Sequence, residues 1–216
     1  NFEKIRNEGY CYIDKSMLIK ELLDLKGEVN LFTRPRRFGK TLNLSMLRYF
    51  FEDTGDGEKN TRNRALFQGL KIMEAGEAYV RQMGMYPVMN LTLKSAKQEN
   101  FETAYYMMQS EFDRHREIIE KGREKLSLKE YELYLEIADE KADEKQVRGA
   151  LKLFSKCMQK ITGRNTVILI DEYDVPLENA YFRGFYEKMV DFIRSLFESA
   201  LKTNDNLQFA VITGCL

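Results

Sequence analysis

The sequence lacks any apolar run approaching the roughly 18 residues that a membrane-spanning helix needs. Its first residues, Asn1 to Lys4, also lack the pattern of a secretory signal peptide. We therefore expect a soluble, cytoplasmic protein with no membrane contact. The chain begins without methionine and stops at a strand-like run, and we interpret both ends as cut from a longer polypeptide.

An excess of charge of either sign is also missing, because 34 Lys and Arg balance 34 Asp and Glu. No global field can therefore recruit nucleic acid or an anionic membrane, and any such contact must be local. The few cysteines, Cys11, Cys157 and Cys215, are odd in number and follow no metal-ligand spacing, which favours reduced and buried thiols. The single histidine, His115, lies in a charged run, where a surface residue is expected rather than a catalytic base.

What the sequence does contain is an alternation of strand-like and helix-like segments. Short apolar runs predict four strands, at residues 29–33, 86–94, 166–174 and 207–214. Helical periodicity follows the first and third of these runs, over residues 41–52 and 181–202. This alternation predicts an α/β fold with βαβ crossovers and a mostly parallel sheet covered on both sides.

The segment between the second and third strands is predicted to be helical and highly charged. Residues 111–150 contain 12 acidic and 9 basic side chains, and pairs such as Glu117 and Lys121 have the i,i+4 spacing of a solvated helix. We interpret residues of about 97–160 as a helical insertion on the rim of the sheet. The alternatives are a second domain, or a charged surface without a partner.

The stretch FTRPRRFGKT, residues 32–41, ends in the Gly-Lys-Thr of a phosphate-binding loop. Gly39 stands where a side chain would prevent the loop from wrapping a phosphate, Lys40 is expected to contact the β- and γ-phosphates, and Thr41 to hold Mg²⁺. The motif's first glycine is replaced by Arg34. An ordinary helix N-terminus with a surface lysine is the alternative. The predicted nucleotide contacts are Arg34, Pro35, Arg36, Arg37, Phe38, Gly39, Lys40, Thr41 and Leu42.

A second motif supports the first. Asp171 and Glu172 end the buried run VILI, where P-loop enzymes place an acid for Mg²⁺ and one branch adds a glutamate that polarises the attacking water. Thr213, at the end of the fourth strand, is placed to sense the γ-phosphate. Two motifs in this order predict a P-loop NTPase fold with three layers, α/β/α.

These residues carry a resemblance to a family. The segments YIDKSMLIKELL, FTRPRRFGKTLNLSMLRYFF, YPVMNL and VILIDEYDVPLENAY, with the final TGCL, resemble the AAA-ATPase-like proteins of bacteria. In that family the arginine that replaces the first glycine is habitual, and the ATPase module is typically followed by a PD-(D/E)XK nuclease-like domain. The resemblance covers essentially the whole chain. It implies an ATP-binding sheet with an additional strand, and a nucleic acid partner only through the missing domain.

The resemblance also implies roles for single residues. Lys40 and Thr41 would contact phosphate and Mg²⁺, Asp171 would be the acid on the metal side, and Glu172 the base. The family's Y-x-D-K motif corresponds to Tyr12, Asp14 and Lys15, which we expect near the nucleotide base, although Asp14 alternatively caps the following helix.

The combined prediction is that residues 1–216 form an AAA-ATPase-like domain. It would bind ATP with Mg²⁺, hydrolyse it, and drive or gate a C-terminal effector. No motif identifies an arginine finger, so a homo-oligomer or another partner is a further expectation. One alternative is an ATP-binding switch with little turnover. The other is a small-molecule kinase, which the glutamate directly after Asp171 disfavours.

Overall fold

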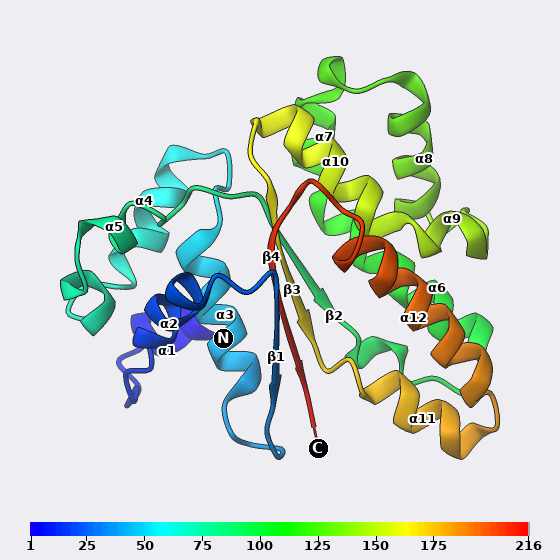
Figure 1. Cartoon of the computed structure of the whole chain (residues 1–216), viewed down its shortest axis with the longest axis horizontal. Helices are drawn as coiled ribbons and strands as arrows, with labels where there is room; N and C mark the ends of the chain where they lie inside the picture. The colour runs from blue at the N-terminus through cyan, green and yellow to red at the C-terminus, as the bar shows by residue number, and fades with distance from the viewer. Residues whose placement is uncertain (216) are drawn as a thin grey trace.

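The sheet consists of four parallel strands, which lie within the predicted apolar runs. In the computed structural model, which describes residues 1–215, they are β1 (Val29–Thr33), β2 (Val88–Thr92), β3 (Thr166–Asp171) and β4 (Leu207–Gly214). Their order across the sheet is β1-β4-β3-β2. The strand β4 therefore separates β1 from β3, which is the additional-strand arrangement that the resemblance implied. All four carboxyl ends meet at one edge (Figure 1).

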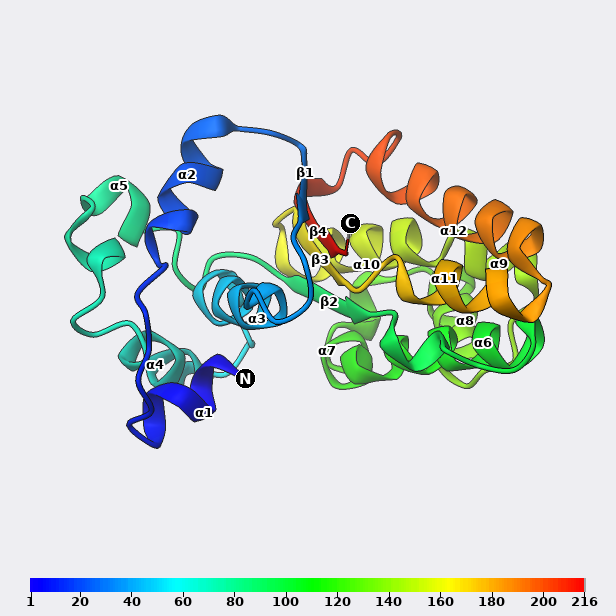
Figure 2. The same cartoon turned by 90° about the horizontal axis from the view of Figure 1, so that it is seen from below.

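One layer of helices comes from the N-terminal part of the chain (Figure 2). Its central helix is α3, and Leu44 and Leu47 on that helix share a core with Leu169 of β3 and Val211 of β4. The elements of this layer are α1 (Phe2–Asn7), α2 (Met17–Leu25), α3 (Lys40–Phe51), α4 (Gly57–Ala65), η1 (Lys71–Glu74) and α5 (Glu77–Val80).

The second layer covers the opposite face of the sheet. Because side chains alternate along a strand, Ile168 and Ile170 of β3 point away from α3 and into a separate core with the helices of this layer. Its elements are η2 (Lys94–Ala96), α6 (Phe101–Gln109), η3 (Ser110–His115), α7 (Arg116–Lys121), η4 (Arg123–Lys125), α8 (Leu128–Ala138), α9 (Glu144–Arg148), α10 (Ala150–Thr162), α11 (Val175–Arg183) and α12 (Tyr186–Leu201). The predicted three-layer α/β/α fold is confirmed.

The predicted continuous helix over residues 181–202 is wrong in one respect. Gly184 has φ +82° and ends α11 in a left-handed conformation, so that α12 begins as a new helix two residues later. Glycine is the residue that adopts this conformation most readily at a helix C-terminus.

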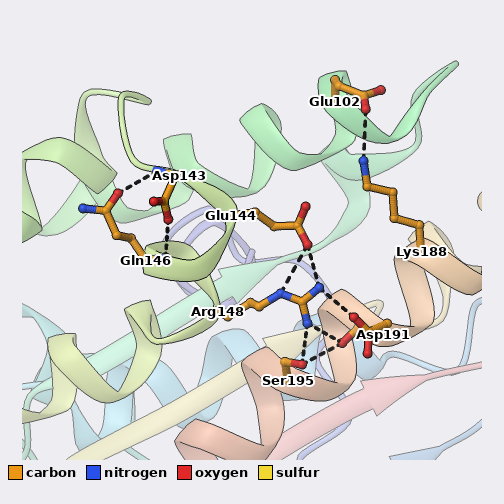
Figure 3. Close-up of polar contacts among 8 residues, drawn as sticks. All are labelled: Glu102, Asp143, Glu144, Gln146, Arg148, Lys188, Asp191 and Ser195. Carbon is orange, nitrogen blue, oxygen red and sulfur yellow. Dashed lines mark hydrogen bonds and ion pairs between the residues drawn. The ribbon is translucent and has the colours of Figure 1, made fainter.

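The charged insertion packs over a face of the sheet rather than only along its rim. Its residues Phe154 and Met158 belong to the same core as Ile168 of β3 and Phe192 of α12. Figure 3 shows the polar side of this contact, where Arg148 of α9 bonds to acidic and hydroxyl groups of α9 and α12. The insertion therefore supplies part of the covering layer of the sheet.

His115 is not the surface residue that its charged neighbours predicted. Its ring lies 4.5 Å from the ring of Phe154, and its Nε2 atom is buried without a hydrogen-bond partner in the described part of the chain. Burial lowers the pKa of His115 to about 4, and the nearby guanidinium groups of Arg48 and Arg114 act in the same direction. The imidazole is therefore neutral at pH 7.

Candidate functional site

The phosphate-loop motif lies between β1 and α3, at the carboxyl edge of the sheet. The Arg34 amide donates to the Gly214 carbonyl over 3.3 Å, so the loop starts in contact with the end of β4. Gly39 is the N-cap of α3, and no side chain caps that helix. The first amide groups of α3 therefore keep their capacity to bind an anion.

The backbone explains which glycines the loop needs. Gly39 has φ +77°, and a Cβ built there would meet no atom within 4 Å, so the backbone conformation rather than crowding requires glycine. Arg37, with φ +71°, shares this left-handed conformation, which costs energy for a residue with a side chain. Arg34 lies outside the left-handed region, which explains how arginine replaces the first glycine of the motif.

The Lys40 ammonium is held by its own loop and by the end of β4. Its Nζ donates to the carbonyls of Arg34, over 2.6 Å, and Pro35, over 3.0 Å, and lies 3.3 Å from Cys215 Sγ. An incoming phosphate would have to replace these contacts. The expectation of buried thiols holds for Cys157 alone, because Cys11 is exposed and Cys215 partly exposed; all three are free of disulfides.

Asp171 and Thr213 form a buried pair on neighbouring strands. The exposed fractions of the two residues are 6% and 2%, and the Thr213 hydroxyl donates to Asp171 Oδ1 over 2.5 Å. The hydroxyl thus satisfies one oxygen of a carboxylate that is otherwise costly to bury. Thr213 lies beside Asp171 because β4 is the direct neighbour of β3.

Glu172 follows Asp171 in a left-handed conformation, with φ +57°. Such a conformation in a non-glycine residue is strained, and strain of this kind is concentrated at functional sites. Its side chain lines a cavity of about 610 Å³ together with Arg36, Lys94 and Lys97.

Lys40 and Thr213 line a different cavity, of about 270 Å³, which also includes Lys15, Arg34 and Phe38. The structure therefore brings Lys40 and Thr213 together, and it links Asp171 to them through the Thr213 hydroxyl. It places Glu172 on a separate cavity, on the β2 side of β3, which shares no lining residue with the cavity of Lys40.

The remaining predicted contacts differ in their surroundings. Thr41 is exposed at the first turn of α3, whereas the Leu42 side chain packs against the core beneath that helix. Pro35 and Arg36 line a third cavity, of about 960 Å³, next to α11. Arg36 also forms an ion pair of 3.0 Å with Glu178 of α11, which sequence analysis missed because 142 positions separate the partners.

The three residues of the Y-x-D-K motif have separate roles. Asp14 accepts hydrogen bonds from the amides of Ser16 and Lys71, over 2.8 and 2.9 Å, and so fixes the turn before α2. Although burial opposes the shift, these hydrogen bonds lower the pKa of Asp14. Tyr12 donates to Met46 Sδ over 3.2 Å, and only Lys15 reaches the cavity that contains Lys40.

A hydroxyl and a carboxylate, the groups of the two predicted metal ligands, suit Mg²⁺ rather than a softer metal. Among residues 1–215, no three His, Cys, Asp or Glu side chains form a cluster able to hold a metal ion. The candidates, Thr41 and Asp171, offer a hydroxyl and a carboxylate. Mg²⁺ characteristically takes one or two such oxygens and completes its shell with water and phosphate.

Comparison with known protein families gives a result that agrees with this geometry. The model of the AAA-ATPase-like family, described as predicted AAA-ATPases, matches residues 1–216. The chain belongs to this family. Membership supports ATP binding and ATPase activity at the level of the family description.

One curated relative is a protein of Azotobacter chroococcum mcd 1 described as "Uncharacterized protein in vnfD 5'region". It is 24% identical over 215 residues, which cover 99% of this chain and 35% of that protein. The chain thus spans about a third of the length of this relative. No solved structure matches. In the described residues, no helix is both long enough and apolar enough to cross a membrane.

Proposed function

We propose that this domain binds MgATP at the loop of residues 34–41 and hydrolyses it. The observation that carries the proposal is the convergence of three segments at the end of β4. The loop contacts Gly214 and Cys215, and Asp171 bonds to Thr213, so the phosphate-binding and acidic motifs flank one strand end.

The roles follow from these positions. The uncapped amides of α3 and the Lys40 ammonium would hold the β- and γ-phosphates. Thr41 and Asp171 would hold Mg²⁺, which supplies charge neutralisation on the phosphate oxygens when it is bound. Lys15 and Phe38, in the cavity beside Lys40, give the base and ribose a place to bind.

Glu172 is proposed as the base that orients and polarises a water molecule. Its side chain lines the cavity on the β2 side of the sheet, and not the cavity proposed for the adenine base and ribose of ATP. Thr213, bonded to the buried acid and lining the cavity with Lys40, is proposed to sense the γ-phosphate. In the longer protein, the nucleotide state would drive or gate an effector domain.

The test is to measure ATP binding and phosphate release for the wild type, Lys40→Ala and Glu172→Gln. Lys40→Ala should lose binding, whereas Glu172→Gln should bind normally and lose turnover. The matched controls are Lys129→Ala and Glu132→Gln, two exposed residues of the insertion, which should behave as the wild type. Binding that survives Lys40→Ala would contradict the proposed site.

The same measurement separates hydrolysis from the alternative of an ATP-occupancy switch. A switch predicts tight MgATP binding with negligible phosphate release from the wild type, and no further change in Glu172→Gln. The strained conformation of Glu172 is compatible with both functions, because such strain occurs in switch regions as well as in active sites, so phosphate release decides between them.

A further inference from the structure

Three exposed cations without carboxylate partners surround the cavity that contains Glu172. Lys94 is the first residue of η2, which follows β2, Lys97 comes directly after η2, and Arg183 ends α11. In the part of the chain that the structure describes, none of the three forms an ion pair within 4.0 Å. The neighbouring cations Arg36 and Lys188 differ from these three, because each forms an ion pair, with Glu178 and Glu102 respectively.

The charge balance of this surface is therefore positive. Arg36 and Glu178 neutralise each other, and Asp174 lines the neighbouring cavity of about 960 Å³ rather than this one. Of the cavity's charged groups, this leaves the cations Lys94, Lys97 and Arg183 against the single carboxylate of Glu172. The chain as a whole is neutral, so this is a local concentration of charge suited to an anion with several charges.

Aromatic rings are exposed directly beside these cations. The exposed fractions of Tyr181, Phe182 and Tyr186 are 68%, 77% and 40%. The Tyr181 ring contacts the other two nearly at right angles, with centroids 5.6 Å from Phe182 and 5.9 Å from Tyr186. Phe182 lines both the cationic cavity and the adjoining cavity of about 960 Å³, so the two form one continuous surface. Clustered exposed rings of this kind mark a binding surface.

We propose that this surface binds single-stranded nucleic acid. Phosphates would contact Lys94, Lys97 and Arg183, and bases would stack on Tyr181 and Phe182. A cationic groove interleaved with exposed aromatic rings is the combination that binds single strands without sequence preference. An acidic protein segment would use the cations and leave the rings without a partner, and a rigid duplex would keep its bases away from them.

Figure 1 shows β2 and α11 on the side of β3 away from β1, whereas Lys40 contacts the chain end that follows β4. The surface shares Pro35, Arg36 and Glu172 with the proposed nucleotide site, and its three cations lie outside that site. Binding does not depend on the proposed ATPase activity, and it is measured without nucleotide. The proposal assigns a contact with nucleic acid to this domain itself, whereas the family resemblance implied such a contact only through a separate nuclease-like domain.

The experiment is fluorescence anisotropy with labelled oligo(dT) and oligo(U) over a range of salt concentrations. The combined variant Lys94→Ala, Lys97→Ala and Arg183→Ala should bind at least about tenfold more weakly at low salt. Three lost phosphate contacts should also reduce the slope of log affinity against log salt by about 2, at ~0.7 per contact for single strands. The control combines Arg62→Ala, Lys129→Ala and Lys145→Ala, which remove the same charge from exposed positions elsewhere.

The aromatic contribution is tested separately. Tyr181→Ser and Phe182→Ser should each weaken binding by at least about fivefold and leave the salt slope unchanged, because stacking is not ionic. Tyr10→Ser, which removes a ring that is 57% exposed on another surface, should have no effect. Lys40→Ala should retain nucleic acid binding even where it loses ATP.

Three outcomes would overturn the proposal. The first is an absence of binding by the wild type at low salt. The second is an equal loss of affinity in the control charge variant. The third is binding of a poly-glutamate peptide in preference to the oligonucleotides, which would assign the surface to an acidic protein partner.

Discussion

The Thr213 hydroxyl donates to the Asp171 carboxylate across the β3–β4 pair, and both residues are buried. The acid at the end of β3 is thus satisfied by the neighbouring strand, which is also the strand that contacts the phosphate-loop motif. The stability of the sheet and the geometry of the candidate site consequently depend on the same bond.

Replacing Thr213 by valine should therefore affect both properties. The change removes the donor and leaves a buried carboxylate oxygen without this partner, at a cost of about 1–3 kcal/mol in the free energy of unfolding. Thr213→Ser should retain most of the stability. The control is Thr166→Val, because the Thr166 hydroxyl is buried without a partner in the described residues and its loss should cost little. Urea unfolding measures all three variants, and equal costs for both valine variants would contradict the role of the bond.

Gly39→Ala should separate conformational strain from ligand binding. Gly39 and Gly163 have φ +77° and +72°, and a Cβ at either position would meet no atom within 4 Å. Alanine at each should cost about 1 kcal/mol in stability, since the backbone strain is the same. Only Gly39→Ala should weaken ATP binding, as measured by calorimetry. An equal loss of affinity in Gly163→Ala would show that the effect is not local.

His115 should make stability depend on pH. Because burial lowers its pKa in the folded state to about 4, from about 6.5 in the unfolded chain, the unfolded state binds more protons between these values. Stability should be complete above pH 6.5 and should fall as the pH drops toward 4. Between pH 7.5 and pH 5 the histidine contributes a loss of about 2 kcal/mol. His115→Phe should lack this part of the pH dependence, measured by denaturant unfolding at both pH values. Parallel curves for the two proteins would contradict the burial of the imidazole.

The Arg148 side chain should contribute more to the free energy of unfolding than an ordinary surface ion pair does. Its guanidinium bonds to Glu144 Oε1 over 2.6 Å, to Asp191 Oδ2 over 2.7 Å and to Ser195 Oγ over 2.5 Å, joining α9 to α12 (Figure 3). We expect Arg148→Ala to cost about 1–2 kcal/mol, because several charge-assisted bonds are lost together. Lys202→Ala, which removes an exposed i,i+4 pair with Glu198, should have a much smaller effect. Thermal unfolding of the two variants provides the comparison.

The elements that local patterns describe well were predicted from the sequence. The runs around VNLFT and VILID are apolar and short, so the strands were recognisable, and the glycine, lysine and threonine of residues 39–41 marked the start of α3. The position of β4 between β1 and β3 came from family resemblance, because no local pattern specifies strand order.

The features that sequence analysis missed depend on contacts between distant residues. The His115 ring packs against Phe154, which lies 39 positions away, and its charged neighbours gave no sign of this contact. The cluster of Lys94, Lys97 and Arg183 forms only because η2 and α11 meet beyond the ends of β2 and β3. The break before α12 could have been predicted from the sequence, because glycine, here Gly184, is strongly enriched just after the last residue of a helix.

The place of β4 in the sheet has a mechanical consequence. Since β1 and β3 never touch, a movement of the loop on β1 can reach the acid on β3 through the sheet only by displacing the strand between them. Under the proposed function, the tip of β4 would be the one connection within the sheet between the nucleotide-binding loop and the acidic residues of β3.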